Sequence, residues 1–292
     1  MAKMKSMILK GGFSLHEISD HSLSSYPFIR TFFPPLKPPL KWAGGKRWLI
    51  PHLKSLYEPF RKYRIVEPFC GGLAVTLALF PSRALLNDIN PHVISFYCWL
   101  QRGFRIEFPM RNEKEMYYTY RERFNFLIKS KKSDSAEATG LFYYLNKTGY
   151  NGLCRFNQKG FFNVPFGQYI KINYEKDFSR YQSPFSQWEF SAKDFMELHL
   201  NCNDFVYADP PYDVEFTHYA KEDFNWKDQV RLAKWLSRHP GPVVLSNQAT
   251  PRIVALYRDL GFALQFLEAP RMISCNGNRA RVQEVLALKG LK

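Results

Sequence analysis

The chain has 292 residues, of which 46% are hydrophobic and 17% aromatic, and 41 Lys and Arg against 26 Asp and Glu give it a formal net charge of +15. This composition excludes an intrinsically disordered tail, and the length suffices for one large domain or two modest ones with a core of their own. The positive charge and the aromatic residues favour a polyanionic partner, because Lys and Arg neutralise phosphates and aromatic rings stack on bases. Charge alone leaves open a basic but otherwise ordinary enzyme surface.

The cysteines are odd in number and widely spaced, which excludes a disulfide framework and a CxxC zinc pair; they are Cys70, Cys98, Cys154, Cys202 and Cys275. No apolar run reaches the ~18 residues of a membrane span, and the start MAKMKSMILKGGF lacks a signal-peptide core. We therefore expect a soluble cytoplasmic protein without a membrane partner or a required metal.

Residues 1–39 end in FFPPLKPPL, and because prolines fix φ and remove backbone donors they predict an irregular N-terminal extension. The segment KWAGGKRWLIPHLKSLY then predicts a glycine turn and a helix that begins near Lys46. YRIVEPF reads as a strand that ends at Pro68, CGG as a tight turn, LAVTLALF as a helix, and ALLNDIN as a second strand that ends in Asp88. This β-α-β order is typical of parallel sheets, whose ligands lie at the carboxyl ends of the strands.

The stretch 93–185 interrupts that order as an inserted domain would. It holds the charged helical segment EKEMYYTYRERFNFLIKSKK and the loop NKTGYNGLCRFNQKGFFNVPFGQY. The alternation resumes with the strand and loop NDFVYADPPY, a helix at 226–238, the strand GPVVLSNQ, a helix at 250–260, and the closing strands ALQFLEA and VQEVLALKG. We expect an α/β fold divided into an extension at 1–39, a first catalytic part at 40–92, the insert at 93–185 and a second catalytic part at 186–292.

The sharpest motif is Asp209-Pro210-Pro211-Tyr212, at the end of the strand FVYA. The Asp209 carboxylate and a neighbouring carbonyl form a rigid pair of acceptors that matches the two hydrogens of an exocyclic NH2 group, and Tyr212 offers a flat face for a base. A proline-stiffened turn is the structural alternative.

A second motif, Glu67-Pro68-Phe69-Cys70-Gly71-Gly72, lies at a strand-to-helix turn, with Asp88 sixteen residues after Gly72. A ligand can approach such a turn closely, and an acid at the tip of the next strand can accept hydrogen bonds from ribose hydroxyls. The turn is not GxGxxG, and AGGKRW lacks P-loop spacing, so a nicotinamide or ATP enzyme is disfavoured.

A third motif, Lys41-Trp42-Ala43-Gly44-Gly45-Lys46, places two cations and an aromatic ring at a predicted helix start. It can hold a carboxylate through donors at that terminus and the lysine charge. A helix cap with solvated lysines is the alternative.

Together and in this order, from Leu40 to Lys289, these motifs resemble the Dam-like adenine-N6 DNA methyltransferases, bacterial or phage-type, of the alpha motif order. The loop YNGLCRFN…FFNVPFGQY resembles the recognition loop of members that methylate GATC, and the tail RMISCNGNRARVQEVLA also matches. The resemblance implies a Rossmann-like methyltransferase sheet with helices on both faces, S-adenosylmethionine (SAM) as cofactor, double-stranded DNA as partner, a flipped adenine as target, and a monomer or weak dimer on DNA.

The resemblance also implies a role for each site residue. SAM lies over Glu67–Gly72, with Asp88 on its ribose, Asp194 and Phe195 beside its adenine, and Trp42 and Lys46 near its methionine end. The complete cofactor set is Trp42, Ala43, Gly44, Lys46, Glu67, Pro68, Phe69, Gly71, Gly72, Asp88, Ile89, Asp194, Phe195 and Asp209. Asp209 and the Pro210 carbonyl hold the target N6, Tyr212 stacks on the base, and Pro211 completes the motif.

For DNA, the resemblance places Tyr150 and Asn151 near the gap or orphan base and Lys41 on the first guanine. Arg155 suits guanine, because a guanidinium bonds O6 and N7 together, although a phosphate contact is the alternative. The DNA set is Lys41, Tyr150, Asn151, Leu153, Arg155, Asn157, Pro165 and Tyr169. The sequence departs from the family where Leu73 replaces the second glycine of the usual FxGxG turn.

Two other classes stay open: a catalytically silent DNA-binding regulator of this fold, and an aminomethyltransferase that acts on RNA or a protein amide. The intact DPPY motif argues against the first, and the loop and the charge favour DNA over the second. Restriction protection, replication and repair, or phage modification would all use the same site.

Overall fold

The computed structural model describes residues 36–213, 224–269 and 282–291. Most of the expected extension, Cys275 and the start of the tail RMISCNGNRA lie outside the described residues. The described end of the extension is not a free arm, because Leu36 is buried in the core and the Tyr181 hydroxyl donates to the Lys37 carbonyl at 2.7 Å.

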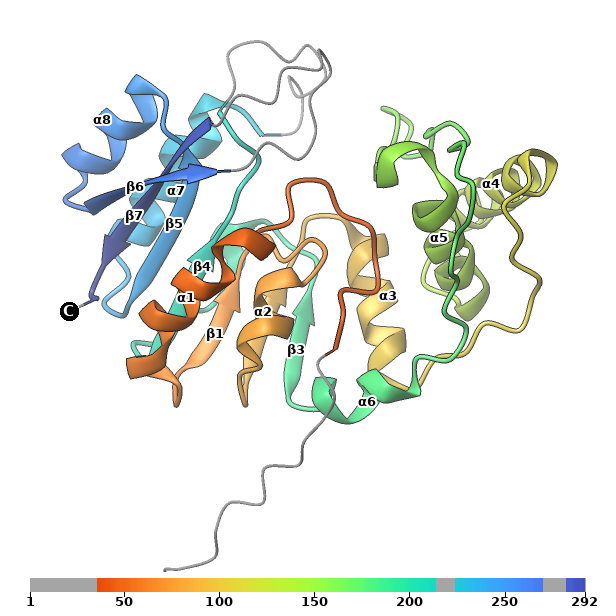
Figure 1. Ribbon diagram of the computed structural model, residues 1–292, viewed down its shortest axis with the longest axis horizontal. Helices are drawn as coiled ribbons and strands as arrows, with labels where there is room; N and C mark the ends of the chain where they lie inside the picture. Colours follow the sequence, from red (N-terminus) through yellow and green to blue (C-terminus); the bar gives the residue numbers. More distant parts are fainter. Residues whose placement is uncertain (1–35, 214–223, 270–281, 292) are drawn as a thin grey trace, which may run out of the picture. The chain divides into compact units, whose positions relative to one another are not determined.

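The described strands form one mixed sheet in the order β3-β2-β1-β4-β5-β7-β6 (Figure 1). The first five pair in parallel, whereas β7 runs antiparallel to both β5 and β6. The strands are β1 Arg64–Glu67, β2 Ala84–Asn87, β3 Trp188–Ser191, β4 Asp204–Ala208, β5 Val243–Gln248, β6 Ala263–Ala269 and β7 Val282–Lys289.

Helices cover both faces of this sheet, as expected. The α-helices of the described residues are α1 Ile50–Tyr57, α2 Ala74–Leu79, α3 Pro91–Gln101, α4 Lys114–Lys129, α5 Ala136–Thr148, α6 Ser179–Phe185, α7 Trp226–Ser237 and α8 Pro251–Asp259. Successive strand residues point to opposite faces. Ile65 and Tyr207 therefore pack with α1 and α2, while Val66 and Val206 pack with α7 and α8. The sheet is a doubly wound α/β structure.

The strand order reverses between β1 and β4, because β2 and β3 extend the sheet to one side and β5 to the other. In open parallel sheets, ligands bind outside the carboxyl ends of the strands at such a switch point. Glu67, Asp88 and Asp209 all lie at this edge, at or directly after the ends of β1, β2 and β4. The fold thus brings together the acids of two motifs that are far apart in the sequence.

Between α3 and β3 the chain forms a helical region with α4, α5, a long loop and α6 (Figure 1). Its core is rich in aromatic rings, and Phe96 of α3 stacks on Tyr143 of α5 with centroids 5.7 Å apart. The expected domain boundary at residue 93 falls inside α3, which begins at Pro91 and also packs against the sheet through the cluster that contains Leu86.

The predicted strands and helices are confirmed to within a few residues, but α3, β3, α5 and α6 were not predicted. Helix α5 is buried on nearly every side, so its sequence AEATGLFYYLNKT carries no amphipathic stripe. Strand β3 is a short edge strand whose burial does not alternate.

Leu73 occupies the turn between β1 and α2 in a left-handed conformation, with φ of 59°, and its side chain is fully buried. That conformation explains why glycine is usual there. We expect Leu73→Ala to destabilise the protein by ~2–5 kcal/mol, because it leaves a cavity. Leu73→Gly, although smaller, should unfold at no lower urea concentration than Leu73→Ala, since it relieves ~1 kcal/mol of strain. A clearly lower midpoint for the glycine variant would contradict this account.

Candidate active site and nucleic-acid interface

Asp209 directly follows β4 and forms an ion pair with Lys46, with Nζ and Oδ1 2.9 Å apart. The Ser246 hydroxyl donates to the same oxygen at 2.9 Å. The side chains of Lys46 and Asp209 are 6% and 20% exposed. Burial raises the pKa of Asp209, while the Lys46 charge and the hydrogen bonds of Lys46 and Ser246 oppose that rise. One carboxylate oxygen, Oδ1, is thus held by two donors at the carboxyl end of β4.

The rest of the DPPY loop is supported by a buried amide network. The Gln229 side chain donates to the Pro211 carbonyl at 2.8 Å, and Asn247 donates to Gln229 at 3.0 Å. Within the described residues, no hydrogen bond occupies the Pro210 carbonyl, so this acceptor is available to a ligand. Lys46 Nζ lies 4.5 Å from the centroid of the Tyr212 ring.

The glycine turn after β1 is shaped around Trp42. A Cβ on Gly71 would lie 2.5 Å from the indole nitrogen, and a Cβ on Gly72 would lie 2.7 Å from the Trp42 Cβ. The Gly71 amide donates to Asp88 Oδ2 at 3.1 Å, and the Asn90 amide donates to Oδ1 at 2.9 Å. Both glycines are required for this approach, which brings the second and third motifs into contact.

Glu67 does not face outward with this turn. It is 3% exposed and accepts a hydrogen bond from the Thr76 hydroxyl. Burial, with a smaller contribution from the charge of Asp209, raises its pKa to about 8. The raised pKa favours the protonated carboxyl group, and its hydrogen bond with Thr76 links the end of β1 to α2.

The other expected cofactor residues occupy different settings. Ile89, beside Asp88, exposes 70% of its surface, whereas Phe195 is buried and packs on Phe69 with ring centroids 5.7 Å apart. Asp194 caps the turn Phe195–Glu197 and is paired with Arg231 at 3.1 Å. Of the remaining residues, Ala43 and Gly44 are exposed, and the Gly44 carbonyl accepts a hydrogen bond from the Lys46 ammonium. The Pro68 carbonyl accepts a hydrogen bond from the Asn87 side chain.

Lys41 connects this site to the helical region. Its backbone N–H donates to the Asn146 side chain at 2.8 Å, and the same amide donates back to the Lys41 carbonyl at 2.9 Å. Its ammonium donates to the Lys147 carbonyl and lies 3.5 Å from the centroid of the Tyr169 ring. Burial, aided by the charge of Lys147, lowers the pKa of Lys41 to about 8.

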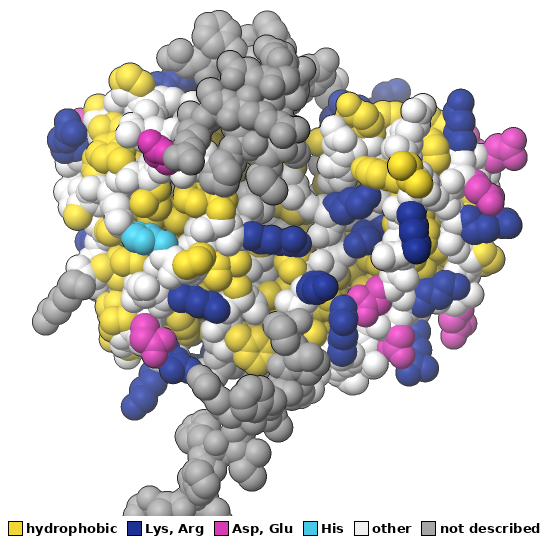
Figure 2. All heavy atoms as spheres, viewed as in Figure 1, with side chains coloured by type: hydrophobic (Ala, Val, Ile, Leu, Met, Phe, Trp, Pro, Cys, Tyr) yellow, Lys and Arg dark blue, Asp and Glu magenta, His cyan; other side chains and the backbone are white. Residues whose placement is uncertain are grey.

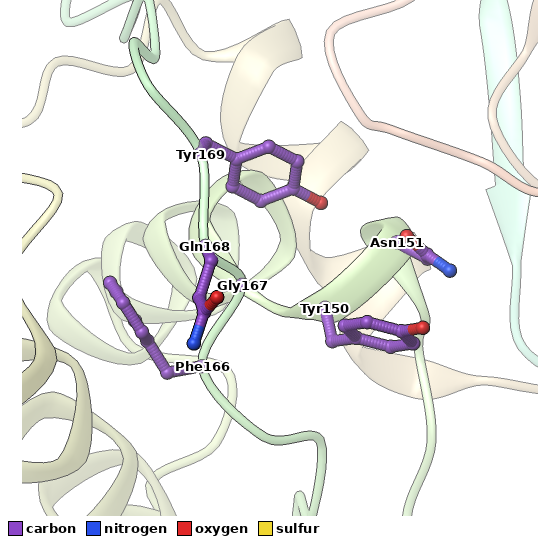
Figure 3. Close-up of a pocket in the computed structure, with 6 residues that line it drawn as sticks. All are labelled: Tyr150, Asn151, Phe166, Gly167, Gln168 and Tyr169. Atoms are coloured by element: carbon purple, nitrogen blue, oxygen red, sulfur yellow. The ribbon is translucent and has the colours of Figure 1, made fainter.

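Beside Lys41, the loop that follows α5 forms an open hollow of about 310 Å³ (Figure 3). Tyr150 and Asn151 stand on one side of it, on the short turn after α5, and Phe166, Gln168 and Tyr169 come from the returning segment. Tyr150 is 50% exposed, and Asn151 has a φ of 52°. Rings and amides in such an arrangement suit an unstacked base.

The remaining expected DNA residues are spread along the loop. Arg155 is exposed and donates to the Asn163 side chain at 2.8 Å. The Asn157 side-chain oxygen closes a turn by accepting from two backbone amides, and the Tyr150 amide donates to the carbonyl of Pro165. Leu153 is half-buried, and its amide donates to the Tyr150 carbonyl. The structure thus joins Lys41 with Tyr169 but engages Arg155 and Asn157 within the loop itself.

Figure 2 shows Lys and Arg side chains along the middle of one face and over its right-hand part.

Among the described residues, no helix is long and apolar enough to cross a membrane. In the same residues, no cluster of His, Cys, Asp or Glu is suited to hold a metal ion.

Sequence reasoning missed the residues that hold the motifs in place: Thr76, Asn87, Asn146, Gln229, Ser246, Asn247 and Glu284. Ser246 and Asn247 carried a usable signal, because they are polar residues that end the otherwise apolar strand VVLSNQ at the ligand-binding edge. Asn87 carried the same signal, since it ends the apolar strand ALLN. The others gave none, because they lie inside helices or strands and become partners only through the tertiary fold.

Comparison with known proteins gives consistent matches. The family described as "D12 class N6 adenine-specific DNA methyltransferase" matches residues 42–273. A retron Ec67 DNA adenine methylase from Escherichia coli is 34% identical over 87% of this chain and 91% of its own length. A DNA adenine methylase from Vibrio cholerae is 36% identical over 85% and 94%, and the type II methyltransferase M.MjaIII from Methanocaldococcus jannaschii is 35% identical over 84% and 96%.

The pKa of Glu67 predicts a pH-dependent stability. Since its folded value of about 8 exceeds the ordinary 4.5, the folded state retains a proton that the unfolded state releases between these values. Stability should therefore fall as pH rises through this window, by up to ~1.4 kcal/mol per pH unit. Glu67→Gln keeps the acceptor for Thr76 and should lose less stability than the wild type between about pH 5 and 8 in urea unfolding. If the free energy of unfolding changed equally with pH in the two proteins, Glu67 would not be the cause of the pH dependence.

Proposed function

Because the chain belongs to the D12 class of N6 adenine-specific DNA methyltransferases, we propose that it transfers a methyl group from SAM to the target adenine within GATC sites of duplex DNA. The Lys46–Asp209 ion pair at the end of β4 carries this proposal. It lies at the switch point of a Rossmann-like methyltransferase sheet, at the same edge as the Gly71–Asp88 turn. Donor site and acceptor site therefore share one edge.

The residues around the glycine turn suit SAM. The half-buried Asp88 carboxylate can accept hydrogen bonds from a pair of ribose hydroxyls, and the exposed Ile89 offers an apolar surface to an adenine ring. Trp42 packs on both glycines, and Lys46 lies close by, where the methionine end of the cofactor would be held. The cofactor, when bound, supplies an electrophilic methyl group on a sulfonium that is a good leaving group.

Asp209 and the Pro210 carbonyl orient the nucleophile. The lone pair of an adenine amino nitrogen is delocalised into the ring, so the nitrogen attacks poorly. If its two hydrogens are donated to Asp209 and Pro210, a more tetrahedral nitrogen is favoured and its lone pair can aim at the methyl group. The Asp209 carboxylate also stabilises the positive charge that develops on the nitrogen. Methyl transfer thus needs no covalent bond to the protein.

The target adenine must leave the base stack to reach Asp209, because its amino group is inside the duplex. Tyr212 offers the face of its ring to the flipped base. The half-exposed Tyr150 can fill the space that the flipped adenine leaves in the base stack. Lys41, Arg155 and the loop around them supply contacts to base edges. The choice of GATC is supported by the likeness of this loop to the recognition loop of GATC methylases.

Incubation with radiolabelled SAM and two duplexes that differ only in one GATC site tests the proposal. We expect label on adenine N6 in the GATC duplex alone. Label in both duplexes would reject the sequence choice. Label in neither, with SAM binding shown separately, would reject the function and favour an RNA or protein substrate or a silent regulator.

Asp209→Asn should reduce single-turnover methyl transfer at least ~100-fold, because the charged acceptor is lost from a water-poor site. Binding of DNA and SAM should change only several-fold, since other residues hold both. Asp177→Asn, at an exposed aspartate paired with Arg105, is a matched control that should keep full activity. Near-normal turnover of the Asp209 variant would show that another group holds the amino nitrogen.

A further inference from the structure

Glu284 is a buried acid at the edge of the candidate active site that none of the motifs includes. It lies on β7 opposite Gln248, the last residue of β5, and thus at the carboxyl end of that strand. It is 5% exposed. Because side chains alternate along β7, Glu284 is on the same face as Leu286, which packs with α1. Lys46 directly precedes the turn that leads into α1.

Glu284 and Tyr212 are neighbours, and each influences the ionisation of the other. Burial is the main cause that raises the pKa of both groups, and their mutual interaction is among the further causes. Lys46 opposes the rise for Glu284, and Asp209 adds to it for both. Lys46, Asp209, Tyr212 and Glu284 therefore form one electrostatic cluster.

Both neighbours have a buried polar atom that is left without a partner. Within the described part of the chain, the Tyr212 hydroxyl and Glu284 Oε2 have no hydrogen-bond partner. A buried polar group in that state is costly, by ~1–3 kcal/mol. The two atoms are complementary, because one is a hydroxyl donor and the other a carboxylate acceptor, and the two groups interact with one another. A hydrogen bond between them would satisfy both.

We propose that Glu284 is a positioning residue, whose carboxylate accepts a hydrogen bond from the Tyr212 hydroxyl and thereby fixes the ring on which the flipped base stacks. The inference rests on the proposed function, because it assigns Tyr212 the role of stacking partner. One face of the ring is already directed at Lys46 Nζ, 4.5 Å from its centroid. A bond at the hydroxyl end would fix the remaining freedom of the ring and leave its other face to the base.

The test uses Glu284→Gln, Tyr212→Phe and the double variant in the full-length protein. The duplex carries 2-aminopurine at the target adenine, whose fluorescence rises when the base leaves the stack. Each single variant should lower the flipped-base signal and, on unmodified duplex, the single-turnover methylation rate by about 10-fold. The affinity for SAM should stay within twofold. The double variant should be no worse than either single one, because both changes remove the same bond.

Gln283→Ala is the matched control, since this neighbouring side chain on β7 is exposed, and it should behave as the wild type. Additive losses in the double variant, or a Glu284→Gln protein with a wild-type flipping signal, would overturn the proposal. A loss of SAM affinity in Glu284→Gln alone would instead make Glu284 a counter-charge for Lys46. If Glu284→Gln fails to fold, Tyr212→Phe tests the same bond from its other end, and normal flipping by it overturns the proposal. An inactive wild type would count against the proposed function, not against this inference.

Discussion

The ion pair between Lys46 and Asp209 is the interaction on which the rest of the site depends. Removal of one partner from a largely buried pair leaves an uncompensated charge, at a cost of ~3–5 kcal/mol. The pair also fixes the direction of the Asp209 carboxylate, because Ser246 and Lys46 bind the same oxygen. Since Lys46 lies near the start of the described chain and Asp209 follows β4, this contact ties the third motif, Lys41–Lys46, to the proposed catalytic loop.

Segment 41–46 extends that connection in both directions. At one end, Lys41 is held to α5 by the reciprocal bonds of Asn146, and its ammonium lies over the ring of Tyr169 in the loop that we assign to DNA recognition. In the middle, Trp42 packs on the glycine turn that we assign to SAM. At the other end, Lys46 holds Asp209. Segment 41–46 therefore contacts the residues proposed to bind DNA, the residues proposed to bind the cofactor and the proposed catalytic aspartate. It connects these three parts of the site through one short stretch of backbone.

The sequence was most informative where local pattern and local chemistry agree. The sequence placed Asp209 and the glycine turn correctly at the sheet edge, through the motif DPPY after an apolar strand and the motif EPFCGG followed by Asp88. The carboxyl ends of parallel strands meet at one edge even when a long insert separates the strands in the sequence. The residues that contact these motifs could not be predicted from the sequence. Ser246, Gln229 and Glu284 come from elements whose neighbours are set only by the order of the strands. Likewise, α5 was missed because a helix buried all round has no polar face to reveal its period.

The central claim is geometric: Asp209 and the Pro210 carbonyl hold the target amino group. A crystal structure of the protein with a GATC duplex and a non-reactive SAM analogue would measure it directly. The account predicts an adenine outside the helix, with N6 at about 3 Å from both acceptors, as hydrogen bonds require. An adenine whose N6 is directed away from Asp209, or held by other groups, would contradict the account.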